Sequence, residues 1–259
     1  IDRTANVNLV FNPAYETLEF HSLSVERDGV VEDRTSTTTI EFARRETQLE
    51  RRMFDGRATA IVRFSDIRIG DRVEYSYTVT GRNPAVRDND SRSFSIGFGA
   101  PVERMFIRSS WSEHAPVSHQ LLGPDPVEQP AFGIREGNQS ISFGPVATPP
   151  FPGERGSPTW VRQLPTLQVT DYQNWYEVSR WSEPYYEPQL SAPVIEIAER
   201  IRAQHETHDA QLIAALRFVQ DEVRYLAISF GAGGYVPASP DDTLERRYGD
   251  CKAKTVLLI

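Results

Sequence analysis

The single cysteine of the chain, Cys251, lies in a segment whose residue types suit nucleophilic chemistry. Gly249 can form a sharp turn and Asp250 can cap a helix, so Cys251 is expected in the first helical turn. The unpaired N–H groups there favour a thiolate, and Lys252 and Lys254 add positive charge. The same N–H groups could hold an oxyanion formed by attack on an acyl carbon. The alternative role for a lone cysteine is that of a small buried hydrophobe.

A nucleophilic thiol needs a base, usually a histidine, and all five histidines precede the cysteine in the chain. They are His21, His114, His119, His205 and His208. The first three are expected to be structural or solvated. His205 and His208, with Asp209, could in principle hold a metal, but their polar connection between two helices favours a solvated turn. On residue types alone Cys251 is thus a candidate catalytic nucleophile without an evident base, and no metal ligand and no cofactor-binding residue is predicted.

The composition narrows the class of protein. Of the 259 residues, 39% are hydrophobic and 25% are charged, which is a balance that can close a core. No apolar run approaches the ~20 residues of a membrane-spanning helix, so no membrane-spanning segment is expected. The net charge of -8 argues against a nucleic-acid partner, which would require a basic surface. One cysteine excludes an internal disulfide and any multi-cysteine metal cluster.

Residues 1 to about 160 have the pattern of an antiparallel β structure. Val73, Tyr75, Tyr77 and Val79 alternate with polar residues, as in a half-buried strand. Further short apolar runs recur at roughly ten-residue spacing between turn signals, which favours a β-sandwich. Residues 28–29 are Asp-Gly, a pair typical of a tight hairpin. Only residues 41–52, rich in Glu and Arg, are expected as a solvated helix or a long loop.

The pattern changes in the second half of the chain. Prolines interrupt regular structure after residue 144, and five aromatic residues follow: Trp175, Tyr176, Trp181, Tyr185 and Tyr186. They either pack on the next domain or form a ligand-stacking platform. From Ser191 the apolar spacing is helical, and Ser239 with Pro240 begins another short helix. The predicted α+β fold has a β-sandwich over 1–165, an aromatic linker over 166–190 and a helical part over 191–259.

Three stretches near the end of the chain form a recognisable set. They are residues 216–226 (LRFVQDEVRYL), 233–237 (GGYVP) and 246–252 (RRYGDCK). Together they closely resemble the nucleophile half of bacterial transglutaminase-like proteins. In the β half, four further stretches resemble the DUF3857-type domain that often precedes that core: residues 26–29 (ERDG), 69–75 (IGDRVEY), 81–84 (GRNP) and 101–104 (PVER).

The resemblance implies a papain-like α+β core with Cys251 as the nucleophile. In that family a histidine and then an aspartate follow the cysteine, and no histidine of this chain takes the base position. Ala253 also departs from the family, in which the residue after the lysine is commonly acidic. We therefore expect a fragment of a larger protein that stops just after the nucleophile motif and is inactive by itself. The resemblance also suggests a periplasmic or cell-envelope location, with the cytoplasm remaining open.

Two functions remain open at this point. The first is an enzyme that acts on a protein or peptide substrate, forms a thioester on Cys251 and passes the acyl group to an amine or to water. Transamidation and hydrolysis share this step. The second is a non-catalytic module that binds a protein or another ligand on a transglutaminase-like scaffold. The long β half, the aromatic segment and Ala253 motivate this alternative.

Overall fold

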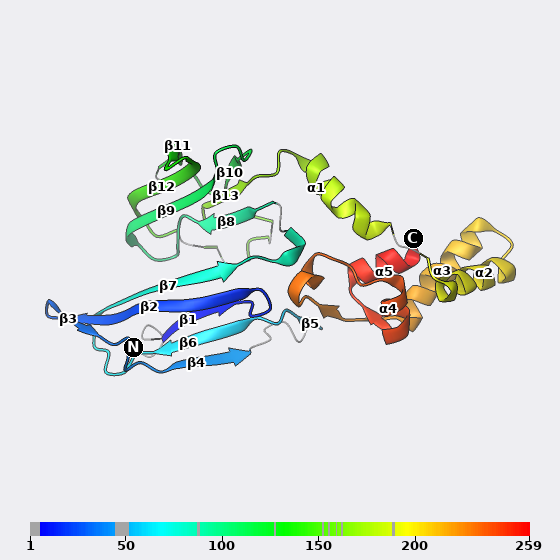
Figure 1. Ribbon diagram of the computed structural model, residues 1–259, viewed down its shortest axis with the longest axis horizontal. Coiled ribbons are helices and arrows are strands. Elements are labelled where there is room, and N and C mark those ends of the chain that lie inside the picture. The colour runs from blue at the N-terminus through cyan, green and yellow to red at the C-terminus, as the bar shows by residue number, and fades with distance from the viewer. Residues whose placement is uncertain are drawn as a thin grey trace. The chain divides into compact units, whose positions relative to one another are not determined.

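The computed structural model describes residues 6–44, 52–86, 89–126, 128–151, 153–154, 156–158, 160–161, 163–187 and 190–259. They form two compact units. The first comprises Ile1–Arg87 and Glu183–Ile259, and the second comprises Asp88–Ser182. Antiparallel sheets and α-helices both occur, consistent with the expected α+β class (Figure 1). The domain boundaries expected at 165 and 190 stay predictions.

The first unit begins with two three-stranded antiparallel sheets. Their orders are β1 (Asn6–Phe11), β6 (Ala58–Arg63), β4 (Ile40–Arg44), and β3 (Val30–Asp33), β2 (Glu16–Arg27), β7 (Arg72–Gly81). Alternate residues of these strands share a core. Val7 and Val62 from one sheet and Leu23 and Val25 from the other are buried in it. The strand predicted around Tyr75 is confirmed as β7, but the expected half-buried alternation is not, because Val73 is half-buried while Tyr75, Tyr77 and Val79 are exposed.

Two local predictions in this region have different outcomes. Asp28 and Gly29 have φ values of 52° and 79° and join β2 to β3, which confirms the hairpin. The residues from Glu41 to Arg44 belong to β4, so the helix-or-loop prediction is wrong for them. These residues form a strand because they pair with β6, a long-range partner that the local charge pattern does not reveal. Residues 45–51 of that prediction lie outside the described part.

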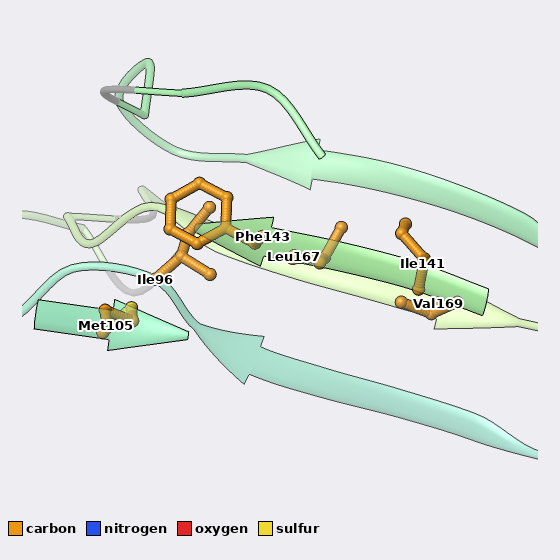
Figure 2. Close-up of a cluster of buried hydrophobic side chains, with 6 residues drawn as sticks. All are labelled: Ile96, Met105, Ile141, Phe143, Leu167 and Val169. Atoms are coloured by element: carbon orange, nitrogen blue, oxygen red, sulfur yellow. The ribbon is translucent and has the colours of Figure 1, made fainter. Parts of the chain in front are cut away.

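The second unit contains two more antiparallel sheets. Their orders are β10 (Ser118–Leu122), β13 (Thr166–Thr170), β8 (Ser91–Ser95), and β11 (Ala131–Arg135), β12 (Asn138–Thr148), β9 (Val102–Ser112). A cluster of buried side chains comes from strands of both sheets and from the residue just after β8, as Figure 2 shows. Its members are Ile96, Met105, Ile141, Phe143, Leu167 and Val169.

Strand β13 differs from the prediction for residues 166–190. The first five residues of the expected linker form the central strand of a sheet, and Leu167 and Val169 are buried in its core. The prediction that prolines interrupt regular structure after residue 144 is wrong at two points, because β12 continues through Pro145 and β13 starts directly after Pro165. The rest of the segment contains α1 (Trp175–Ser182) and the 3-10 turn η3 (Glu183–Tyr186).

The C-terminal part of the first unit is mainly helical. Its helices are α2 (Ala192–Gln204), α3 (His208–Glu222), α4 (Pro240–Arg246) and α5 (Cys251–Leu258). Ser239 caps α4 by accepting a hydrogen bond from the N–H of Asp242, as predicted. Ser191 precedes α2 without capping it, because its hydroxyl donates to the carboxylate of Asp241 instead. These helices confirm the prediction that the spacing of apolar residues becomes helical from residue 191.

Short parallel pairings complete this unit. They join β14 (Arg224–Tyr225) to β16 (Tyr248–Gly249), and β15 (Ala227–Ile228) to β5 (Met53–Phe54). Two 3-10 turns, η2 (Pro84–Val86) and η4 (Gly231–Gly234), are also in contact. Beside them the side-chain amide of Asn83 donates to the carbonyl of Gly231 at 3.0 Å. These contacts tie the C-terminal part of the unit to its β-rich part.

A buried carboxylate connects two loops of the β-rich part of the first unit. Asp71, whose side chain is 3% exposed, accepts hydrogen bonds from Nε and Nη2 of Arg27 at 2.9 and 2.7 Å. The backbone N–H of Arg68 donates to the same carboxylate at 2.8 Å. These bonds favour the ionised form and lower the pKa of Asp71 from 3.8 to about 2. Arg27 therefore holds the 66–71 loop against the β2–β3 hairpin.

Replacing the largest fully buried side chain tests the core of the second unit. Phe143 has no exposed surface, so Phe143→Ala should lower the free energy of unfolding by about 3–5 kcal/mol through lost burial and a cavity. Urea unfolding followed by circular dichroism measures the change. Phe106→Ala is the matched control, because Phe106 is 46% exposed, and should cost about 1 kcal/mol or less. Equal losses for the two variants would contradict the assignment of the core.

The lowered pKa of Asp71 predicts a pH-dependent contribution to stability. A carboxylate whose pKa is lower in the folded than in the unfolded protein stabilises the fold at pH values above its unfolded pKa, which is near 4. This contribution is lost as the pH falls towards 2. Asp71→Asn should therefore reduce stability at pH 7, and its difference from the wild type should shrink between pH 5 and pH 2. Urea midpoints across this range measure it. Asp28→Asn, in the exposed turn, is the control, and its urea midpoint should change with pH in the same way as that of the wild type.

Candidate functional site

Cys251 is the first residue of α5, as the sequence predicted, and its side chain is exposed. The alternative role of a small buried hydrophobe is therefore wrong. Asp250 is the N-cap, and its Oδ1 accepts a hydrogen bond from the N–H of Ala253 at 3.0 Å. Within the part of the chain that the structure describes, the amides of Cys251 and Lys252 have no hydrogen-bond partner. They are the orphan donors of a helix start and suit an anionic oxygen.

Backbone hydrogen bonds fix the segment that leads into this helix. The N–H of Arg224 donates to the carbonyl of Arg247 at 2.9 Å, and the N–H of Leu226 donates to the carbonyl of Gly249 at 3.1 Å. The sharp turn predicted at Gly249 lies at Arg247 instead, which has a left-handed φ of 57° and ends α4. A left-handed residue is a common way to end a helix and redirect the chain.

Gly249 has a packing role. A Cβ atom at this position would lie 2.9 Å from the Cβ of Ala253 and 3.2 Å from Cγ2 of Thr243. Ala253 and Thr243 are themselves buried, at 1% and 0% exposure. The close approach of β16, α4 and α5 therefore requires small residues here.

Both lysines near the thiol have other partners. The ammonium of Lys252 forms an ion pair with Oδ2 of Asp250, and both side chains are largely buried. The ammonium of Lys254 donates to the carbonyl of Val223 at 2.6 Å, which connects α5 to the end of α3. The predicted positive charge is thus present near the helix start, but it is bound to groups of the protein. Sequence reasoning missed Val223 because a backbone acceptor 31 positions away leaves no local signal.

The histidines do not gather around the cysteine. Nε2 of His21 lies 2.7 Å from Oγ1 of Thr78, across β2 and β7. The His119 ring packs on Phe132, with centroids 4.5 Å apart, and His114 lies in the loop after β9. The carbonyl of His205 accepts from Gln211, and His208 begins α3. No histidine side chain forms a hydrogen bond with the Cys251 thiol within the described ranges.

The other candidate groups are a metal site, the aromatic segment and a hollow near α5. No group of three or more His, Cys, Asp or Glu in the described part is arranged to hold a metal ion, and this includes the residues around His205. Trp175 and Tyr176 on α1 are 86% and 69% exposed, which leaves the stacking interpretation open for these two. A hollow of about 310 Å³ is lined by Asp250 and Ala253, among others, while Cys251 lies outside it.

Comparison with known families accounts for the β-rich half. A family model described as a "Domain of Unknown Function with solved-structure structure (DUF3857)" matches residues 1–131, half of the chain. The chain belongs to this family. A DUF3857 domain therefore covers the first unit's two sheets and continues into the strands of the second unit. A search of curated proteins gave no match.

A solved structure shares the fold over nearly the whole DUF3857 chain. It is the crystal structure of a "putative protease" from Parabacteroides distasonis, with a TM-score of 0.77 and 14% sequence identity. The match covers 98% of this chain but 50% of the other, so this chain spans half the length of that protein. The similarity extends past the DUF3857 region to the helices around Cys251. No helix in the described residues is long and apolar enough to cross a membrane.

The cap of α5 can be tested without changing the cysteine. Asp250→Ala removes the acceptor for the Ala253 N–H and should cost about 0.5–2 kcal/mol of stability. Asp250→Asn keeps a capping oxygen while removing the charge that pairs with Lys252. Urea unfolding of both variants separates the two contributions. Equal losses would show that the ion pair, rather than the cap, holds the start of the helix.

Proposed function

We propose that this DUF3857 chain is the nucleophile-bearing part of a transglutaminase-like cysteine enzyme. In this proposal residues 1–165 form a β-sandwich domain, and residues 191–259 form the first half of a papain-like core. The observation that carries it is the exposed Cys251 at a capped helix start, beside two amides that suit an oxyanion. The fold shared with a protein described as a "putative protease" supports the same class of chemistry.

The reaction begins with attack of the Cys251 sulfur on a carboxamide or peptide carbonyl carbon. The thiol proton passes to a base, and the carbonyl oxygen becomes an oxyanion near the amides of Cys251 and Lys252. Collapse breaks the C–N bond, the amine leaves with a proton, and a thioester remains on the sulfur. Attack by water then gives hydrolysis, and attack by an amine gives transamidation. The protein or peptide substrate supplies the acyl group.

The base of this reaction comes from outside the described residues. Transglutaminase-like proteins place a histidine and an aspartate after the cysteine, and the histidines described here make no hydrogen bond to the thiol. We therefore propose that this chain is inactive by itself and that the protein at its full natural length is the enzyme. The deciding groups are that histidine and aspartate.

The second candidate is a non-catalytic binding module on the same scaffold. It is favoured by the thiol that has no hydrogen-bonded base among the described residues and by the exposed rings of Trp175 and Tyr176. The two candidates differ in what happens at the sulfur. Only the enzyme passes through a covalent thioester on Cys251.

A cysteine variant of the protein at its full natural length tests the proposal. Hydrolysis of a fluorescent casein, and coupling of a glutamine peptide to a fluorescent primary amine, should both be measured. Cys251→Ala should lower whichever rate is present at least about 1000-fold, because the nucleophile is lost. Mass spectrometry of the acid-quenched wild type should find the acyl group on the Cys251 peptide.

The same experiment identifies the alternative. An unchanged rate in Cys251→Ala would reject Cys251 as the nucleophile. A folded wild type with neither rate and no acylated peptide would support the binding module. The unfolding midpoint of Cys251→Ala, with Cys251→Ser as a conservative companion, shows whether a lost rate reflects chemistry or a lost fold.

A further inference from the structure

Strand β11 of the second unit is the edge of its sheet and is exposed along its whole length. The sheet order is β11, β12, β9, so β11 pairs on one side with β12 alone (Figure 1). All five residues from Ala131 to Arg135 are exposed. Edge strands are usually protected by proline, lysine or a bulge, whereas β11 contains no proline and has its one charge at the last position. Among the residues that the structure describes, nothing pairs with this edge, so it is open to another strand.

The hairpin turn shows which backbone groups of β11 point outwards. Glu136 and Gly137 have φ values of 52° and 75°, and they join Arg135 to its partner Asn138. A two-residue turn of this kind makes the flanking residues a hydrogen-bonded pair, and such pairs then alternate along the hairpin. Residues 131, 133 and 135 therefore bond to β12. The N–H and C=O groups of Phe132 and Ile134 point away from it.

One side-chain contact agrees with this alternation. The hydroxyl of Ser140, on β12, donates to the carbonyl of Gly133 at 3.3 Å, as expected if this carbonyl faces β12. A Cβ built on Gly133 would meet no atom within 4 Å, so the sheet face opposite to Phe132 and Ile134 is uncovered at this residue. The outward N–H and C=O groups of Phe132 and Ile134 can therefore form β-sheet hydrogen bonds with the backbone of an added strand.

A hollow lies on the face that Phe132 and Ile134 share. Its volume is about 320 Å³, and its apolar lining includes Trp111, Val117, Phe132 and Ile134. The last two are 55% and 71% exposed. The His119 ring packs against Phe132 and fixes one wall. A volume of this size is at the lower end of small-ligand sites and suits an apolar side chain.

One charged residue lines this hollow. It is Glu113, which is exposed and whose carboxylate has no hydrogen-bond or ion-pair partner in the part of the chain that the structure describes. The backbone carbonyl of Glu113 accepts from the side-chain amide of Gln139, so the loop is held against β12. An unpaired carboxylate at an apolar hollow complements a basic group on the occupant.

We propose that β11 binds an extended peptide by strand addition. The peptide backbone pairs with Phe132 and Ile134, an aromatic or branched apolar side chain enters the hollow, and a basic side chain two positions away reaches Glu113. Main-chain bonds supply affinity in this mode, and the hollow and the carboxylate supply specificity. This site is independent of Cys251 and of the chemistry proposed for it.

A labelled peptide tests the proposal on the whole chain. The probe is a fluorescein-labelled heptapeptide, Ser-Thr-Trp-Thr-Lys-Thr-Ser, and binding is followed by fluorescence anisotropy. Saturable binding by the wild type is expected. Replacing Lys by Glu in the peptide should weaken binding about tenfold or more, and Glu113→Gln should reduce the difference between the two peptides.

Two variants at one position separate the backbone from the side chain. Ile134→Pro removes an outward N–H that the ladder to β12 does not use, while Ile134→Ala keeps the N–H and removes a similar part of the hollow's wall. Ile134→Pro should bind at least about tenfold more weakly than Ile134→Ala. Unfolding midpoints check both folds. If Ile134→Pro does not fold, a peptide N-methylated at Trp and Lys should show the same loss with the wild type.

Three results would overturn the proposal. They are no saturable binding by the folded wild type, equal affinities for Ile134→Ala and folded Ile134→Pro, and equal affinities for the methylated and unmethylated peptides. Light scattering tests the competing occupant, a second copy of this chain. A dimer that Ile134→Pro abolishes, and that the peptide does not dissociate, would assign the edge to self-association instead.

Discussion

The hydrogen bonds between the segment before α5 and the segment after α3 determine where the candidate nucleophile lies. Arg224 and Leu226 donate to the carbonyls of Arg247 and Gly249, so the chain enters α5 alongside β14. The helix can then start directly at Cys251 because Asp250 supplies the cap. Without this short parallel pairing, neither the exposed sulfur nor the two neighbouring amides would have a defined direction.

Cationic side chains stabilise the first unit at two places by bonding to acceptor groups of the protein itself. Near α5, Lys252 pairs with Asp250 and Lys254 donates to the Val223 carbonyl. In the β-rich part, Arg27 pairs with Asp71 and also with Asp66, and these pairings lower the pKa of both carboxyl groups. In each case a cation links segments that are distant in sequence or fixes a turn. These cations are therefore partly neutralised by the protein itself.

Local patterns in the sequence predicted the elements that depend on local physics. The strand around Tyr75, the Asp28–Gly29 hairpin and the caps Ser239 and Asp250 are confirmed, because each depends on a few neighbouring residues. The two-residue parallel pairings were not predicted, since two residues are too few to show a period. The burial of Leu167 in a central strand was also missed, because long-range pairing decides it.

The first unit is discontinuous along the chain, and this affects how the protein forms during synthesis. Strand β5 at Met53–Phe54 pairs with β15 at Ala227–Ile228, and all the residues of the second unit lie between them. A ribosome therefore releases the complete second unit before β15 exists. The two N-terminal sheets can form early because all their strands lie before residue 82. The order of synthesis thus makes the surroundings of Cys251 the last part of this chain to assemble.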